Sequence, residues 1–540
     1  MQCALGLDFG TSSVRALIVD CADGRDVGTG VANYASGTEG VLLDPKDHNL
    51  ARQNPGDYPS AIYAAIKEAN REALSNGFDK NELVGIGVDT TGSTPIPLAA
   101  DGMPLGMQQE FNGNLAAMAW LWKDHTSHAE AEEISEMARK QGRPYLAKRG
   151  GAYSSEWLWS KALHCARTAP EVFEAAHTWM ELCDFIPSRL TQLGTAVPRS
   201  ICAAGHKSMY SEEWGGLPNK EFLGAIDPAL AALRDRMFDK AFPSDHVAGP
   251  LCEDRSKSFD LKPGVAVAVG ILDAHAGAVG SGVAPGRMVK IIGTSTCDIL
   301  VGSHVPDIPG VAGIVEGSVI PGLTGIEAGQ SAVGDIFAWW SKVCGHSQEE
   351  LAKDAERLRP GQSGLVALDW NNGNRNILAD PLLTGLLVGQ TLHTNPPEIY
   401  RALIEATAFG ALKIIQRIEE YGVEIKELVA CGGIAEKSPL TMQIYADVLN
   451  RPIRLSRSPQ APALGAAIFG AVVGGVHPDV STAQAAMTGF KDQEYRPNPA
   501  AVEVYARLFT IYDDLHDAFT HAKAPPVMKE LIRIRNEASK

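Results

Sequence analysis

The strongest constraint on the fold is a sequence pattern that occurs twice. The first copy, LGLDFGTSSVRALIVD from Leu5 to Asp20, has apolar residues on both sides of a polar turn that contains Gly10, Thr11 and Ser12. This pattern predicts two strands joined by a tight, hydroxyl-rich loop whose N–H and O–H groups face a ligand. For this segment alone, an ordinary hairpin explains the pattern equally well.

The second copy is MVKIIGTSTCDILVG, from Met288 to Gly302. Its Gly293, Thr294 and Ser295 take the places of the Gly-Thr-Ser of the first copy. Two similar hairpins about half a chain apart predict two related domains, each with a loop that faces phosphate. A nucleotide clamped between the two domains is the natural inference.

Acidic residues occur where strands are expected to end. Asp8 lies just before the first turn and is well placed to hold a hydrated Mg²⁺, whereas Ile291 has the corresponding place in the second copy. Asp273 follows the strand-like GVAVAVG of residues 264–270 and opens a helix of small residues. It could be a helix N-cap or a catalytic carboxylate aimed at a cleft. Glu327 is expected near the end of a further strand.

Polar and glycine-rich loops are the remaining candidates for ligand contacts. The strand expected at residues 84–89 leads into the loop TTGST at 90–94, and LVACGG at 428–433 ends in a double glycine. Residues 198–216 have the composition of a loop with one central cation, Lys207. A surface position is the usual explanation of a lysine, but its small neighbours would let Lys207 reach into a cleft. The spacing of a Walker A motif is absent.

Composition excludes several classes of protein. The chain has 540 residues, 45% hydrophobic and 21% charged, as expected for a globular protein of two or more domains. A formal charge of −16 argues against a nucleic-acid or membrane surface. Nine scattered cysteines without a C-x-x-C pair suggest neither disulfides nor a zinc site. With no signal segment and no long apolar run, the expected location is cytoplasmic.

Periodicity predicts an α/β fold throughout the chain. The connection at residues 282–286 is rich in glycine and looks like a hinge between two halves. Helices are expected over residues 58–74, from about 128 to 140, and over 154–164, 397–421, 439–449 and 461–475.

Several stretches resemble the FGGY family of carbohydrate kinases. They are LDFGTSSVRALIVD, GVDTTGSTPIP, GILDAHAGAVG, IIGTSTCDILVG and CGGIAEKSPLTMQIYADVLNRP, in this order across nearly the whole chain. Within the family, LWKDHT, GGAYSSEW, ELCDF, AGHKS, EAGQSAVGDI and LDWNNGNR are most similar to members that act on L-ribulose. One departure is Gln390, which follows Gly389 where the family has an apolar residue.

The resemblance implies an actin-like ATPase fold, with two RNase H-like domains around a central cleft. It implies an N-terminal domain at 1–283 and a C-terminal domain at 284–540. By position it makes Asp273 the general base and Asp8 a ligand of Mg²⁺ through water. It implies contacts to the sugar from Gly92, Lys207, Asp273 and Glu327. For ATP it implies contacts from Gly10, Thr11, Ser12, Gly293, Thr294, Gly329, Gly432 and Gly433.

The implied activity is transfer of phosphate from ATP to the terminal hydroxyl of L-ribulose, giving L-ribulose 5-phosphate in L-arabinose catabolism. Its cofactors are ATP and Mg²⁺, and its partners are small molecules, with a homodimer as one option. A kinase for another ketopentose or pentitol, such as D-ribulose, is the nearest alternative. More distant alternatives are a non-kinase actin-like ATPase and a sugar-responsive repressor.

Overall fold

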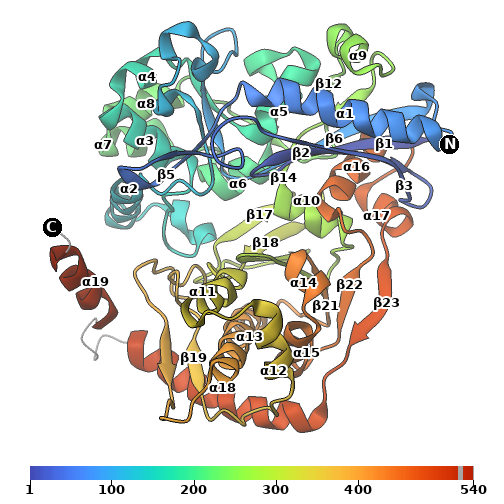
Figure 1. Ribbon diagram of the computed structural model, residues 1–540. Helices are drawn as coiled ribbons and strands as arrows, with labels where there is room; N and C mark the ends of the chain where they lie inside the picture. Colours follow the sequence, from blue (N-terminus) through green and yellow to red (C-terminus); the bar gives the residue numbers. More distant parts are fainter. Residues whose placement is uncertain (521–526, 539–540) are drawn as a thin grey trace. The chain divides into compact units, whose positions relative to one another are not determined.

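The computed structural model describes residues 1–520 and 527–538 (Figure 1). The chain forms two compact units. The first consists of Met1–Gly282, Gly313–Gly325 and Gln460–Gly489, and the second of Val283–Ala312, Ile326–Pro459 and Phe490–Lys540. The division of the chain at residue 283 into two domains stays a prediction, whereas the first unit also takes in two later segments.

The first unit is built on a sheet whose first three strands are antiparallel. Strand β6 pairs parallel with β1, and β13 pairs parallel with β6. The antiparallel pairing of β1 with β2 confirms the hairpin expected from Leu5 to Asp20. The strands lie in the order β12 (Val247–Pro250), β13 (Ala266–Ala268), β6 (Leu83–Thr90), β1 (Cys3–Phe9), β2 (Ser13–Asp20) and β3 (Asp26–Asn33), with β14 (Ile271–Leu272) also on β6.

The sheet of the second unit has an equivalent order. Its hairpin of β15 and β16 is antiparallel, β21 pairs parallel with β15, and β22 pairs parallel with β21. The second predicted hairpin is thus confirmed, and it occupies the same place in its sheet as the first. The strands lie in the order β18 (Thr324–Ala328), β16 (Thr296–Gly302), β15 (Arg287–Ile292), β21 (Glu427–Cys431), β22 (Ile453–Ser456) and β23 (Phe490–Tyr495).

Two helices cover opposite faces of the first sheet, α1 (Asp57–Ser75) and α16 (Ala461–Val473) (Figure 1). The strand register shows which residues of the sheet face each helix, because successive side chains along a strand point to opposite faces. Gly28 on β3 faces α1, where an added Cβ would lie 2.2 Å from the Ala69 carbonyl oxygen. Gly6 and Gly87 are partners in β1 and β6 and face α16. A Cβ on Gly87 would lie 1.7 Å from the Ala466 carbonyl oxygen, so α16 lies directly on the strand backbone.

Helix α10 (Asp273–Gly280) packs on α16 in the same close way. A Cβ on Gly465 would lie 1.8 Å from the Ala276 carbonyl oxygen, and one on Gly280 would lie 2.0 Å from that of Ala461. The small residues of α16 therefore fix α10 and its first residue, Asp273, over the sheet.

Other predicted helices are present as α2 (His128–Lys140), α13 (Pro396–Glu420) and α15 (Pro439–Leu449). Two expectations were wrong. Helix α3 (Leu158–Thr168) begins later than residue 154, because Ser154 takes part in a turn that its carbonyl closes with the Trp157 N–H. The segment 198–216 is not simply a loop, because it contains α6 (Ile201–Ser208), whose N-cap Ser200 accepts a hydrogen bond from the Ala203 N–H.

The remaining elements complete the two units. In the first unit they are β4 (Leu42–Asp44), β5 (Asp47–Gln53), β7 (Pro95–Leu98), β8 (Ala119–Trp120), α4 (Pro170–Ala175), β9 (Thr178–Glu181), α5 (Leu182–Thr191), β10 (Arg199–Ser200), α7 (Lys220–Ile226), α8 (Pro228–Arg234), β11 (Ala241–Phe242), α9 (Glu253–Phe259), β17 (Gly313–Glu316) and α17 (Val480–Met487). In the second they are α11 (Gly334–Cys344), α12 (Gln348–Glu356), β19 (Val366–Leu368), β20 (Leu386–Val388), α14 (Gly433–Lys437), α18 (Pro499–Thr520) and α19 (Val527–Ala538).

Among the helices described, none combines the length and apolarity needed to cross a membrane. The nine cysteines are free thiols.

Candidate active site

The first glycine loop is held in place by hydrogen bonds to its own backbone carbonyl groups. The Gln53 side chain donates to the carbonyl oxygen of Thr11 at 2.8 Å and to that of Gly10 at 3.3 Å. The carbonyl oxygen of Ser12 accepts a hydrogen bond from the Tyr34 N–H at 2.9 Å. These bonds fix the path of the loop between β1 and β2, which is a requirement for a loop that presents N–H groups to an anion.

The second glycine loop is held in a similar way. The carbonyl oxygen of Gly293 accepts from the Gly334 N–H at 3.1 Å, and that of Thr294 accepts from the Val333 N–H at 2.7 Å. Both donors lie at the start of α11. A Cβ on Gly293 would find no atom closer than 3.8 Å, so the loop has open space beside it.

Three carboxylates gather where β1, β6 and β14 end. Asp8 and Asp89 are direct partners in the parallel register of β1 and β6. Ile271 of β14 pairs with Asp89, which brings Asp273 to the same edge of the sheet. Asp8 and Asp89 are buried, and Asp273 is half-buried.

Burial disfavours ionisation of Asp8 and Asp89, and repulsion by neighbouring carboxylates adds to this effect at Asp89. Burial raises the pKa of Asp89 well above its usual range, and the nearby Asp8 and Asp273 carboxylates raise it further. Burial also raises the pKa of Asp8, although the Arg15 guanidinium, 3.6 Å away, opposes this shift. Within residues 1–520 and 527–538, neither carboxylate oxygen of Asp89 has a hydrogen-bond partner.

This set of donors fits a hydrated magnesium ion. Mg²⁺ prefers oxygen ligands, keeps several waters, and is commonly bound through one or two carboxylates. A cation beside Asp8 and Asp89 would also offset the repulsion that raises the pKa of Asp89.

Asp273 is the first residue of α10, and Leu272 occupies the N-cap position. The Oδ1 atom of Asp273 accepts a hydrogen bond from the Ala274 N–H at 2.7 Å. Gly92 lies against Leu272, since an added Cβ would lie 2.3 Å from a Leu272 methyl carbon. The predicted sugar-contact loop and the predicted base are therefore neighbours in the first unit.

Lys207 lies on α6 and is 5% exposed, so the expectation of a lysine on a loop was wrong in its local structure. Its Nζ lies 5.8 Å from the centre of the Trp157 ring, and its carbonyl oxygen accepts from the Tyr153 hydroxyl at 2.7 Å. Tyr153 and Trp157 thus contact this lysine, and both also belong to the hydrophobic core of the first unit.

Two buried charged residues hold the loop that contains Gly92. The ammonium group of Lys161 donates to the carbonyl oxygen of Ser93 at 3.1 Å. Glu181 accepts hydrogen bonds from the Ser93 hydroxyl and from the Thr94 N–H, the latter at 2.8 Å. Burial lowers the pKa of Lys161 and raises that of Glu181, and each partly offsets the shift of the other.

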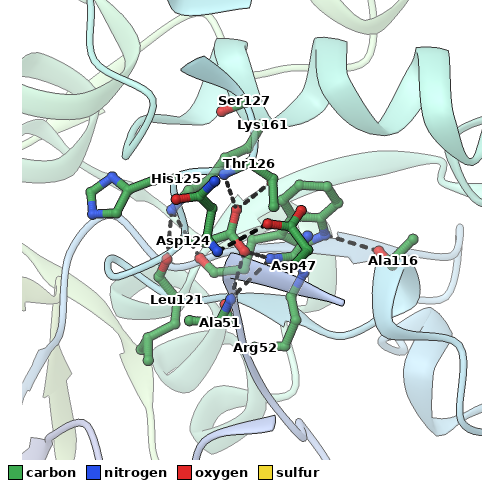
Figure 2. A network of polar contacts seen from close by, with 12 residues as sticks. Asp47, Ala51, Arg52, Ala116, Leu121, Asp124, His125, Thr126, Ser127 and Lys161 are labelled. Carbon is green, nitrogen blue, oxygen red and sulfur yellow. Dashed lines mark hydrogen bonds and ion pairs between the residues drawn. The ribbon is translucent and has the colours of Figure 1, made fainter. Parts of the chain in front are cut away.

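Figure 2 shows how Lys161 also joins a second polar network. Its ammonium donates to the carbonyl oxygens of Trp120 and Leu121 at 3.1 and 2.9 Å. Nearby, Arg52 forms a buried ion pair with Asp124 and stacks on the Trp120 ring. Because Gln53 follows Arg52 on β5, this network also supports the side chain that holds the first glycine loop.

In the second unit, Glu327 lies half-buried on β18, as predicted. Gly329 follows this strand with φ 149°, and a Cβ there would lie 2.1 Å from the Thr296 carbonyl oxygen. The residues beside it form a small pocket, whose lining includes Gly329, Gln330, Asn376, Gly410 and Lys413.

Gly432 and Gly433 follow β21 at the start of α14. Gly432 has φ 95°, a left-handed conformation that favours glycine. A Cβ on Gly433 would meet no atom within 4 Å. Gly433 therefore leaves open space beside the backbone, as a flat ligand requires, whereas a Cβ on Gly432 would lie 2.6 Å from the Ile292 carbonyl oxygen.

Asp89, Lys161 and Glu181 are site residues that were not predicted from the sequence. A signal for Asp89 existed, because it ends a buried strand next to the TTGST loop. Lys161 is a single cation in the aromatic stretch SSEWLWSKALH, where a buried charge implies a specific partner.

The chain matches the FGGY family of carbohydrate kinases over both domains: the N-terminal domain at residues 3–280 and the C-terminal domain at residues 288–473. The chain belongs to the FGGY family of carbohydrate kinases. The protein is thus a sugar kinase, a transferase. The solved structure of xylulose kinase from Rhodospirillum rubrum shares its fold, with a TM-score of 0.80 at 23% identity over 96% of this chain and 99% of that one. The predicted actin-like ATPase fold is therefore confirmed.

Curated relatives within the family cover nearly the whole kinase. Ribulokinase of Vibrio parahaemolyticus is 42% identical over 95% of each chain. Ribulokinase of Halalkalibacterium halodurans is 39% identical over 98% of this chain and 97% of its own.

Proposed function

We propose that this FGGY kinase transfers the γ-phosphoryl group of ATP to the terminal hydroxyl of L-ribulose, giving L-ribulose 5-phosphate. The observation that carries a phosphoryl-transfer role is the convergence of Asp8, Asp89 and Asp273 at one edge of the first sheet. The choice of sugar rests on relatives named ribulokinase at 39–42% identity over nearly the full length.

In this proposal Asp273 accepts the proton of the attacking hydroxyl. Its half-buried position at the start of α10 leaves the carboxylate accessible to a ligand. A carboxylate that is ionised near neutral pH can remove the proton as the hydroxyl oxygen attacks phosphorus. Gly92, Lys207 and Glu327 contact the other hydroxyl groups of the sugar, so that an incorrect sugar leaves buried polar groups unpaired.

ATP is bound by the two glycine loops and by the glycines that follow β18 and β21. The loop residues proposed for phosphate are Gly10, Thr11, Ser12, Gly293 and Thr294. Gly329, Gly432 and Gly433 are proposed to contact the rest of the nucleotide. Asp8 would hold Mg²⁺ through water with Asp89 beside it, and the ion would supply neutralisation of phosphate charge.

The test is a coupled ADP-release assay over a panel of pentuloses and pentitols. We expect ATP consumption to require a sugar and Mg²⁺, with the largest kcat/KM for L-ribulose. Product with D-ribulose, D-xylulose or a pentitol but none with L-ribulose would overturn the substrate assignment. Sugar-independent hydrolysis at the same rate would instead indicate an actin-like ATPase that is not a kinase.

A further inference from the structure

Cysteine and histidine side chains, which are of the types that bind transition metals, form a cluster in the first unit that includes none of the carboxylates described above. Cys202 and His206 are one turn apart on α6, so they share a face of that helix. His275 is the third residue of α10. All three side chains are at most 1% exposed.

The geometry of the cluster suits one tetrahedral ion. A ligand atom from each of the three residues lies within 4.8 Å of the other two. The Nε2 atoms of His206 and His275 are 3.2 Å apart. Two nitrogens bound to one zinc at about 2.0–2.1 Å lie about 3.3 Å apart at a tetrahedral angle. The Ser318 hydroxyl, 3.1 Å from the His206 Nε2, places an oxygen at the edge of the cluster.

The chemistry of the donors selects the class of ion. A thiolate and two imidazoles favour Zn²⁺ and similar transition metals, whereas Mg²⁺ prefers oxygen. Without an ion, the same contact is a hydrogen bond between two imidazoles, in which one Nε2 carries a proton. Binding of a metal would replace this proton and that of the thiol, and would release protons to solvent.

We propose that Cys202, His206 and His275 form a binding site for a divalent transition-metal ion of the Zn²⁺ class. The ion would join α6 to α10. Because Lys207 follows His206 and Asp273 lies two residues before His275, an ion here would fix the spacing of two helices that carry predicted sugar-binding residues. The binding itself does not depend on which sugar the enzyme uses.

Cobalt provides a direct probe, because thiolate-bound Co²⁺ has a charge-transfer band in the near ultraviolet and tetrahedral Co²⁺ absorbs strongly in the visible. Chelator-treated full-length protein would be titrated with Co²⁺ and then with Zn²⁺. We expect one equivalent of Co²⁺ to produce both bands and Zn²⁺ to abolish them. Zinc should also raise the melting temperature, because a ligand that binds the native state stabilises it.

Substitution of single cysteines tests whether Cys202 supplies the thiolate that binds the metal. Cys202→Ser should lose the charge-transfer band, whereas Cys165→Ser should keep it. Cys165 is a matched control, since it is a fully buried cysteine on helix α3 of the same unit. A wild-type protein without the band, or a band that survives in Cys202→Ser, would overturn the proposal.

X-ray absorption of the zinc-loaded wild-type enzyme needs no substitution and covers the case in which the variant fails to fold. One sulfur and two imidazole nitrogens around zinc would support the site. A shell of nitrogen and oxygen alone would refute it.

Discussion

Asp273 makes a structural contact and has a proposed catalytic role, and the two can be separated at the level of one atom. Its Oδ1 accepts the Ala274 N–H, a structural contact that an amide oxygen can also make. Only the carboxylate can take a proton from a sugar hydroxyl. The substitution Asp273→Asn therefore keeps the first contact and removes the second.

We expect Asp273→Asn to lower kcat by about 10²–10⁴-fold, the usual effect of losing a general base, with little change in the thermal melt. The measurement is kcat with L-ribulose beside a melting curve. Asp254→Asn is the matched control, because Asp254 also lies in the first turn of a helix, α9, and should keep full activity. If Asp273→Asn retained more than about a tenth of wild-type kcat, Asp273 would be a structural residue.

At the residue scale, the place of a site residue on its strand or helix could be predicted from the sequence better than the side chains around it. The places of Asp8, Asp273 and Glu327 at strand ends follow from periodicity alone, and the structure has them there. The burial of Lys207 and the pairing of Lys161 with Glu181 depend on helices and strands distant in sequence, so no local pattern could reveal them. Asp89 was overlooked because its proximity to Asp8 exists only in the parallel register of β1 and β6.

At the element scale, α16 is the helix that determines where α10 lies. The sequence predicted its helical structure from a run of small apolar residues, but it did not predict its neighbours. Glycine and alanine occur there because the backbones of β1, β6 and α10 approach it closely, as the contacts of Gly465 and Gly87 demonstrate.

The close packing of α10 on α16 can be tested by adding a single methyl group to α16. Gly465→Ala would place a Cβ 1.8 Å from the Ala276 carbonyl oxygen, so α10 or α16 must move. We expect a loss of about 3 kcal/mol in stability, at the upper end of the range for overpacking, and a lower melting temperature. Activity should fall as well, because α10 carries Asp273.

Gly224→Ala in α7 is the control. Its added methyl group meets only the Ala231 side chain, at 3.3 Å, and both substitutions favour a helix equally. Equal melting temperatures for the two variants would mean that α16 does not lie against α10 as described.

At the scale of the whole molecule, the first unit depends on residues far along the chain. One face of its sheet is covered by α16, which belongs to the segment Gln460–Gly489. Residues 1–282 alone would expose that apolar face of the sheet to water. No neighbouring part of the fragment could take the place of α16.

We therefore expect residues 1–282 expressed alone to aggregate, or to bind a hydrophobic dye and melt without a cooperative transition. Joining residues 460–489 to them through a flexible linker should improve solubility and restore cooperativity. The readouts are size-exclusion chromatography and calorimetry. A monomeric, cooperatively melting 1–282 fragment would contradict this dependence.

Because α16 lies late in the sequence, it is synthesised well after the sheet that it covers. A ribosome that has finished residue 282 must add about 190 more before α16 is complete, and at about 5–20 residues per second this takes about 10 to 40 s. Throughout that interval the newly made sheet carries an uncovered glycine-lined face. We therefore expect slow codons or chaperone capture between residues 282 and 473 to govern how much of the kinase reaches the native state.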